Sequence, residues 1–249
     1  MRQVSVKFVP RVWMVKQKQQ CLSISLELCN RPTSDSTFLG NVIMGDETWV
    51  YGYDPETRVQ SSQWKLPSSP CAKKVHQSRS NIQVMKIVFS ERIVRAKFVP
   101  RNTMVNSEYN KDLLERLRND VRRKWPEKLA NGFIFHHDNA PCHTSLLVRK
   151  FLSNKNIMVY PHPPYSPNLA PCDFWLFPKV KMTVKGKRLV SIQDIEAATT
   201  VQLKTLEKED FQNCFRKWQE RWDKCVRSGG STLMGINGNV SFTVIIFFI

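Results

Sequence analysis

The sequence is short of acidic residues. Its 21 Asp and Glu stand against 38 Lys and Arg, which leaves a formal net charge of +17. A protein with so little negative charge is expected to meet an acidic polymer, and nucleic acid is the partner we favour. A ribosomal protein or a binder of membrane surfaces has a similar charge balance, so composition alone leaves these alternatives open.

A leader sequence and long apolar runs are also missing. The first twenty residues are studded with charge and contain no uninterrupted apolar core, so they are not a signal peptide. The C-terminal string VSFTVIIFFI is strongly apolar, but a membrane-spanning helix needs roughly twenty residues, about twice its length. We therefore expect no membrane partner.

Cysteines in a metal-binding pattern are absent as well. The seven cysteines form no CxxC pair. Cys142, His143 and Cys172 could be imagined around zinc, but their spacing matches no common zinc pattern. Free thiols in a reducing compartment are the simpler interpretation.

What is present has the composition of a globular protein, with 41% hydrophobic and 24% charged residues. Alternating or apolar runs predict strands, and apolar residues at helical spacing predict helices. We expect strands over 41–54, 81–89, 92–99, 132–138 and 156–160, and helices over 107–125, 144–155 and twice more after a capping box that begins at Ser191. This order favours an α/β fold in which helices cover both faces of a mixed sheet.

Three segments lie outside that pattern. Residues 1–39 are basic and are interpreted as a linker or N-terminal arm ahead of a domain over 40–228. Residues 55–80 carry three prolines among Ser and Lys. They predict a long exposed loop, and such loops are usually functional. Residues 229–249 form an apolar tail that we expect to lie outside the domain.

Three aspartates carry the chemical argument. Asp46 in IMGDETWVYGYD and Asp138 in FIFHHDNAPCHT follow apolar runs, and Asp173 in YSPNLAPCDFWLF opens an aromatic segment after a gap of 34 residues. Mg²⁺ prefers carboxylate oxygens and takes few protein ligands. Two such ions, about 3.5–4 Å apart, can activate the attacking oxygen and stabilise the leaving oxygen of a phosphodiester. Three aspartates are the minimal set for such a pair, so we expect a divalent-metal site.

Each aspartate also has an ordinary structural explanation. Asp46 could end a strand at a turn. Asp138 could form a turn or cap a helix from Thr144, and Asp173 could cap a helix from Phe174. The chemical interpretation depends on the combination of the three acids with the motifs around them.

Neighbouring side chains are weighed in the same way. His136 and His137 precede Asp138, but Mg²⁺ prefers oxygen, so a supporting or packing role is favoured. Glu47 is expected to point to the opposite face of its strand from Asp46, which makes it an improbable ligand.

Some residues suggest nucleic-acid contacts. Tryptophans can stack on unpaired bases, although core or interface packing is the ordinary explanation; the candidates are Trp49, Trp64 and Trp175. Cations of the 55–80 loop are candidates for phosphate contacts, although a solvated charge run is the ordinary explanation; they are Lys65, Lys73, Lys74 and Arg79.

Long strings around these acids resemble the mariner branch of the Tc1/mariner transposases. The matching segments are GDETWVYGYDPET, HHDNAPCHT, VYPHPPYSPNLAPCDFWLFPK and FRKWQERWDKCV, and KFVPR at 7–11 resembles the linker before the catalytic domain. The gap of 34 residues before the last aspartate is the mariner spacing. A mariner-like segment also occurs in a host fusion with a SET methyltransferase domain.

The resemblance implies an α/β, RNase H-like fold with a mixed five-stranded sheet flanked by helices. Asp46, Asp138 and Asp173 then correspond to a DDD triad that is catalytic and binds two Mg²⁺ or Mn²⁺ ions. The implied activity is that of a nuclear transposase, which cleaves DNA and transfers strands and has no small-molecule substrate. The 55–80 loop falls where the family has a clamp that reaches its partner subunit, which implies a homodimer.

The sequence departs from the family pattern at both ends. The sequence starts almost at the linker, so we expect the paired helix-turn-helix modules that precede the linker in the family to be absent, and the resemblance dissolves near residue 230. These departures keep an alternative open. The chain could be a relic that dimerises and binds DNA without sequence preference and with impaired catalysis.

Overall fold

The computed structural model describes residues 14–53, 78–99, 103–130, 132–187 and 189–231, and for Gly52 and residues 78–87 only the backbone. One mixed sheet of five strands has the order β3-β2-β1-β4-β5. Strands β1 (Val42–Tyr53), β2 (Ser78–Phe89) and β3 (Ile93–Phe98) pair antiparallel. Strands β4 (Ile134–His136) and β5 (Met158–Val159) extend the sheet from β1 in parallel. The predicted mixed five-stranded sheet is confirmed.

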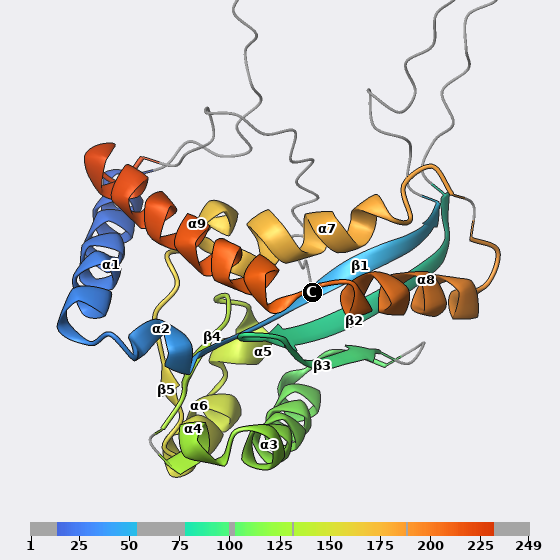
Figure 1. Cartoon of the computed structure of the whole chain (residues 1–249), viewed down its shortest axis with the longest axis horizontal. Helices are drawn as coiled ribbons and strands as arrows, with labels where there is room; N and C mark the ends of the chain where they lie inside the picture. The colour runs from blue at the N-terminus through green and yellow to red at the C-terminus, as the bar shows by residue number, and fades with distance from the viewer. Residues whose placement is uncertain (1–13, 54–77, 100–102, 131, 188, 232–249) are drawn as a thin grey trace, which may run out of the picture.

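Helices cover both faces of this sheet (Figure 1). One face carries α3 (Ser107–Lys124), α4 (Pro126–Ala130), α5 (Pro141–Thr144) and α6 (Leu146–Asn154). The other carries α7 (Phe177–Met182), α8 (Ile192–Lys204), α9 (Lys208–Arg227) and α1 (Val15–Ser34), and α2 (Phe38–Asn41) leads into β1. Each face has its own hydrophobic core.

Strand β1 divides its side chains between the two cores. Ile43 belongs to the core under α3 and α6, whereas Met44 belongs to the core under α7 and α9. Because successive side chains of a strand point to opposite faces, Asp46 lies on the Met44 face and Glu47 on the Ile43 face. This alternation decides which part of the molecule each acid can reach.

Several elements differ from their predicted bounds. The expected helix over 144–155 is split at Ser145, whose backbone is extended (φ −59°, ψ 152°) and whose side chain accepts a hydrogen bond from the Val148 amide to cap α6. Residues 78–80, expected in the loop, belong to β2. The last helix ends at Arg227, just before Gly229 and Gly230, which have φ of 63° and 80°. Residues 55–77 and 232–249, predicted as loop and tail, lie outside the described residues.

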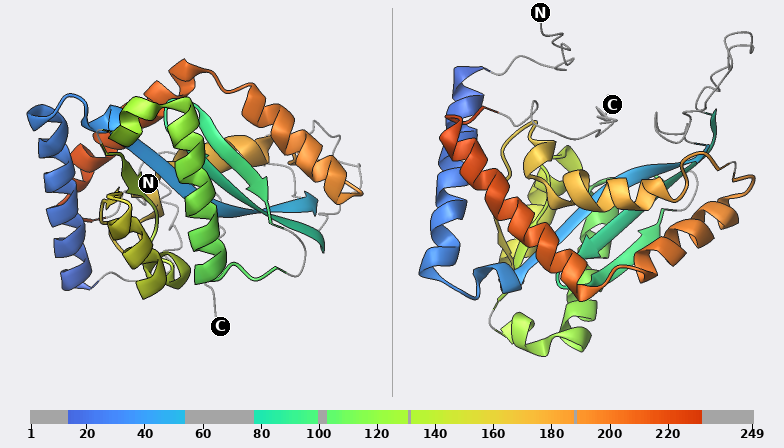
Figure 2. Two further views of the ribbon diagram at one scale, coloured as in Figure 1. Left: turned by 90° about the horizontal axis from the view of Figure 1, so that it is seen from below. Right: turned by 45° about the horizontal axis from the view of Figure 1, so that its top comes forward.

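Helix α1 falls inside the segment predicted to be an arm. Its buried face packs on α9, as two views of the ribbon show (Figure 2). The Sγ atoms of Cys21 and Cys225 lie 3.3 Å apart in this contact, and Gly230 lies so close that an added Cβ would meet the Lys18 carbonyl oxygen at 2.1 Å. Residues 15–34 therefore complete the core, and the boundary predicted at residue 39 does not set them apart from it.

In the described part of the chain, no helix is both long enough and apolar enough to span a membrane.

Candidate active site

Strands β1 and β4 bring the first two predicted aspartates to the same level. The parallel register pairs Met44 with His136, so Asp46 and Asp138 each lie two residues further along. Asp46 is in the interior of β1 and not at its end, because β1 continues as a hairpin with β2 and pairs Asp46 with Ile87. Asp138 lies two residues after the end of β4.

The third aspartate comes from a π-helical turn, η2 (Cys172–Leu176), which runs directly into α7. This differs from the expected helix capped by Asp173, since Asp173 lies inside the turn and its amide donates to the Ala170 carbonyl oxygen at 3.0 Å. Single π-helical turns are rare in proteins as a whole, but many of those that occur lie at functional sites. The preceding 3₁₀ turn, η1 (Pro167–Leu169), is fixed by the Trp218 indole, which donates to the Leu169 carbonyl at 2.7 Å.

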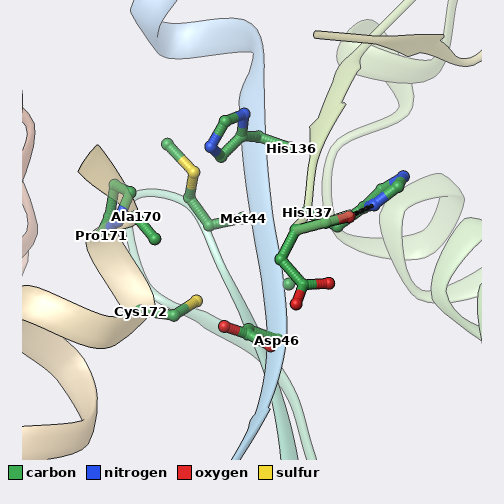
Figure 3. Close-up of a pocket in the computed structure, with 9 residues that line it drawn as sticks. Met44, Asp46, His136, His137, Ala170, Pro171 and Cys172 are labelled. Carbon is green, nitrogen blue, oxygen red and sulfur yellow. Dashed lines mark hydrogen bonds between the residues drawn. The ribbon is translucent and has the colours of Figure 1, made fainter. Parts of the chain in front are cut away.

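A small cavity lies where these segments meet (Figure 3). Its volume is about 10 Å³, close to that of one water-sized sphere. Its lining comes from β1, the end of β4 and the start of η2, and comprises Met44, Gly45, Asp46, His136, His137, Asp138, Ala170, Pro171 and Cys172. In the close-up, the Asp46 carboxylate points toward Cys172, the residue before Asp173.

Negative charge is concentrated at this corner. Burial and the charges of Asp173, Asp138 and Glu47 raise the pKa of Asp46 well above its usual range. Burial and the charge of Asp138 raise the pKa of Asp173 to about 7, although Lys181 opposes this. The three predicted aspartates therefore lie close enough to repel one another.

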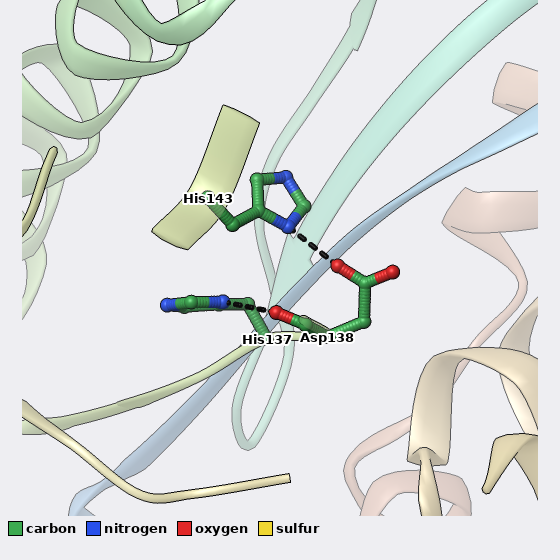
Figure 4. A group of neighbouring side chains, drawn as sticks. All are labelled: His137, Asp138 and His143. Atoms are coloured by element: carbon green, nitrogen blue, oxygen red, sulfur yellow. Dashed lines mark hydrogen bonds and ion pairs between the residues drawn. The ribbon is translucent and has the colours of Figure 1, made fainter. Parts of the chain in front are cut away.

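Asp138 is held in its ionised form by direct contacts. Its Oδ1 accepts a hydrogen bond from the Ala140 amide at 3.1 Å and lies 2.6 Å from Nδ1 of His143 (Figure 4). Burial raises the pKa of Asp138, but the hydrogen bond and charge of His143 and the Ala140 amide outweigh it and lower that pKa below its usual value. The turn role considered for Asp138 is thus present, alongside a contact with His143, which the sequence had suggested only for a zinc site.

His143 contacts two acids of the site, a role that the sequence did not predict. It is 4% exposed, and its Nε2 lies 3.2 Å from the Glu47 carboxylate. Burial lowers the pKa of His143, but the charge of Glu47 and the hydrogen bond to Asp138 outweigh it and raise that pKa well above its usual range. Glu47, which was not expected to act as a ligand, thus reaches the site from the opposite face of β1. The available signal was the position of His143 five residues after Asp138, at a predicted helix start.

The two histidines before Asp138 have different roles. His136 is buried against His162 and Trp218, with ring centroids 5.3 and 5.1 Å away. Burial lowers its pKa well below the usual value, so it is a neutral packing residue. His137 donates from Nδ1 to the Asp138 carbonyl oxygen at 2.6 Å. His136 thus packs in the core, as favoured, whereas the supporting role favoured for His137 stays a prediction, because its ring is also placed where it could ligate a metal.

The donor set suits a hard divalent cation. Carboxylate oxygens are the ligands that Mg²⁺ prefers, and a cation among them would relieve the repulsion that raises the pKa values of Asp46 and Asp173. In the described part of the chain, one group of His, Cys and acidic side chains has ligand atoms within 4.8 Å of one another, namely His137, Asp138 and His143. It does not include Cys142 or Cys172, which the zinc interpretation would require. It also does not include Asp46 or Asp173, so the metal triad of Asp46, Asp138 and Asp173 stays a prediction.

The proposed nucleic-acid contacts have separate outcomes. Trp175 packs in the core against Phe89 and Phe211, with ring centroids 5.6 and 5.2 Å away, so it is not a base-stacking platform. Trp49 is half-buried on β1. Arg79 lies on β2, of which only the backbone is described there, and the remaining candidates, Trp64, Lys65, Lys73 and Lys74, lie outside the described residues.

Comparison with curated proteins points to one group of relatives. The chain is 30% identical over 201 residues to the mariner Mos1 transposase of Drosophila mauritiana, covering 79% of this chain and 57% of that protein. It is 27% identical over 231 residues to the histone-lysine N-methyltransferase SETMAR of Homo sapiens, covering 90% of this chain and 33% of that protein. The chain thus spans between a third and little more than half of these relatives. No family model matches it.

Solved structures agree with these relatives. The crystal structure of the catalytic domain of Mos1 mariner transposase aligns with a TM-score of 0.75 and 25% identity, covering 91% of this chain and all of that one. The Mos1 mariner paired end complex with Mn aligns with a TM-score of 0.84 and 27% identity, covering 92% of this chain and 67% of that one. The predicted RNase H-like fold is confirmed by these alignments.

Proposed function

We propose that this chain, which carries a mariner transposase catalytic domain, cleaves DNA strands and transfers them to a new site with the help of divalent cations. The chain spans only part of its curated relatives, so this activity is inferred from the site. The observation that carries the proposal is the meeting of β1, the end of β4 and the start of η2 around one cavity, whose lining includes Asp46, Asp138 and the residue before Asp173.

The roles of the residues follow from their chemistry. Asp46, Asp138 and Asp173 would hold two Mg²⁺ or Mn²⁺ ions. When bound, such ions supply an activated attacking oxygen and stabilise the leaving oxygen of a phosphodiester. The chain contributes rigid positioning: Asp46 is fixed on β1 and its Oδ1 accepts from the Glu47 amide at 2.7 Å. Asp138 is oriented by the Ala140 amide.

DNA is the proposed substrate. The net charge of +17 supports binding of the phosphate backbone, and we assign phosphate contacts to Lys65, Lys73, Lys74 and Arg79. A similar solved structure is a Mos1 transposase paired-end complex with left transposon end. We further propose a homodimer through the 55–80 loop, and work in the nucleus.

The test is a nicking assay on supercoiled plasmid. We expect the chain to produce open circles with Mn²⁺ and none with EDTA. Asp138→Ala should reduce the rate by roughly a thousandfold, because a lost metal ligand removes several kcal/mol of transition-state stabilisation. The control is Asp112→Ala, which alters an exposed acid of α3 that pairs with Arg116 and should leave nicking unchanged.

Two outcomes would contradict the proposal. Nicking by Asp138→Ala at the parent rate would remove the acid triad from the chemistry. Salt-dependent DNA binding without any metal-dependent cleavage would instead identify the chain as a non-catalytic relic.

A further inference from the structure

We propose that His143 is a positioning residue that clamps the Asp138 carboxylate to Glu47 of β1 and thereby fixes one metal ligand of the site. The proposal deepens the proposed function and depends on it. It assigns a role to the two side chains at this corner that the acid triad leaves unexplained.

The clamp joins two strands of the sheet. His143 comes from α5 and is 4% exposed. Its Nδ1 lies 2.6 Å from Oδ1 of Asp138, and its Nε2 lies 3.2 Å from Oε2 of Glu47. Asp138 follows β4 and Glu47 is the neighbour of Asp46 on β1, so one imidazole spans the two strands that carry the first two acids.

Both contacts of His143 are hydrogen bonds to carboxylate oxygens. Each ring nitrogen of His143 is directed at a carboxylate oxygen, and the contact of Nδ1 with Asp138 is the shorter of the two. A hydrogen bond to a carboxylate is shorter and stronger than one between neutral groups. His143 therefore uses its ring nitrogens on Asp138 and Glu47, which is the arrangement of a positioning residue.

The clamp orients Asp138 without covering it. Both of its contacts are made by Oδ1, with His143 and with the Ala140 amide. Figure 4 shows the other carboxylate oxygen pointing away from the imidazole. One oxygen of Asp138 is thus fixed by the protein, and the other is presented in a defined direction.

Glu47 is the second carboxylate that contacts the imidazole. Its charge adds to the repulsion at Asp46, and its side chain is only 15% exposed. A partly buried carboxylate that interacts with both Asp46 and Asp138 is costly unless it is paired. Pairing with His143 offsets that cost and makes Glu47 the anchor of the clamp. Residues that orient metal ligands in this way typically change metal affinity or activity by about 10–100-fold when altered.

The experiment compares variants that keep different parts of the imidazole. His143→Asn places an amide near the position of Nδ1 and can still hold Asp138. His143→Gln places its amide near the position of Nε2, and His143→Ala keeps neither contact. Thr199→Ala, which removes a buried hydroxyl that bonds only within α8, reports the effect of general destabilisation. Mn²⁺ is titrated into DNA-free protein and the free ion is followed by electron paramagnetic resonance, with a thermal melt of each metal-free variant.

We expect His143→Ala and His143→Gln to weaken Mn²⁺ binding by about 10-fold to 100-fold. His143→Asn should weaken it less than His143→Ala, because it keeps the contact with Asp138 but loses the anchor at Glu47, and Thr199→Ala should stay within about threefold of the parent. Parent-like Mn²⁺ binding by His143→Ala, or a loss in His143→Asn as large as in His143→Ala, would overturn the role of His143 while leaving the proposed function standing. Absence of Mn²⁺ binding by the parent would instead contradict the proposed function.

The hydrogen bond itself can be observed without metal. In the metal-free parent, the Nδ1 proton of His143 should give a strongly downfield proton resonance that disappears in His143→Ala. A folded parent without that resonance would overturn the clamp, whatever its Mn²⁺ affinity.

Discussion

Some residues of the candidate active site destabilise the folded protein when metal is absent. Asp173 is the clearest example, since burial and the charge of Asp138 raise its pKa to about 7. In the unfolded chain the same carboxyl ionises near pH 4. Between these values the folded state binds the extra proton, so this group makes the folded protein less stable as pH rises from about 4 to 7.

Asp173→Asn should therefore stabilise the protein when metal is absent. We expect a gain in the free energy of unfolding at pH 8, because the variant has no carboxylate to repel Asp138. Part of the side chain contacts water, which screens the repulsion, so the gain should be on the order of 1–2 kcal/mol. The gain should be smaller at pH 5, where the folded parent carries the proton. Urea unfolding in EDTA at the two pH values measures this gain. An equal gain at both pH values would contradict its assignment to repulsion between carboxylates.

At this scale the sequence is informative about acids and silent about their partners. Asp46, Asp138 and Asp173 stand in long strings that resemble one family, so they can be selected without a structure. The contact of His143 with Glu47 joins residues 96 positions apart, and no local pattern encodes it. Alternation along β1 predicts that Glu47 and Asp46 point to opposite faces of the strand. It does not predict that His143 lies beside Glu47 on that other face.

At the scale of elements, the site depends on how closely β1 and β4 approach. Gly45 lies between Ile43 and Glu47 on the face that meets the Phe135 ring of β4. A Cβ added there would lie 2.7 Å from a Phe135 ring carbon. Glycine therefore lets the strands pack with Phe135 buried at 3% exposure and keeps Asp46 level with Asp138.

Gly45→Ala should disturb both stability and chemistry. The extra methyl group overpacks the core and should cost about 1–3 kcal/mol of the free energy of unfolding. It should also lower the rate of Mn²⁺-dependent nicking, because the shift moves Asp46 relative to Asp138. Gly40→Ala is the matched control, since an added Cβ there meets nothing within 4 Å. Urea unfolding and plasmid nicking of both variants are the measurements, and equal behaviour of the two would refute the packing argument.

Element types follow from periodicity better than element ends do. The predicted strand over 41–54 is observed as Val42–Tyr53 and the predicted helix over 107–125 as Ser107–Lys124. The division into α5 and α6 was not predicted, because it depends on the extended backbone of Ser145 and not on hydrophobic spacing. The π-helical turn at Asp173 is likewise invisible to a helical pattern.

At the scale of the whole molecule, α1 and α9, the first and last helices of the described chain, pack together in one hydrophobic core. Cys21, Ile24 and Leu28 are spaced for one helical face, and they meet α9 nearly two hundred residues later. The charged and polar residues around them led to the prediction of an arm. Local sequence cannot show that a short apolar face has a distant partner, which is why the prediction for residues 1–39 missed this packing.

The contribution of α1 to folding can be measured with two leucines of the same helix. Leu28 is 2% exposed in the core, whereas Leu26 is 42% exposed. Leu28→Ala should lower the free energy of unfolding by about 2–5 kcal/mol, since it leaves a cavity against α9. Leu26→Ala should change it by less than about 0.5 kcal/mol. Urea denaturation followed by tryptophan fluorescence and by circular dichroism should give one coincident transition for both variants. If Leu28→Ala unfolds like Leu26→Ala, or if α1 melts separately, α1 is an appended arm after all.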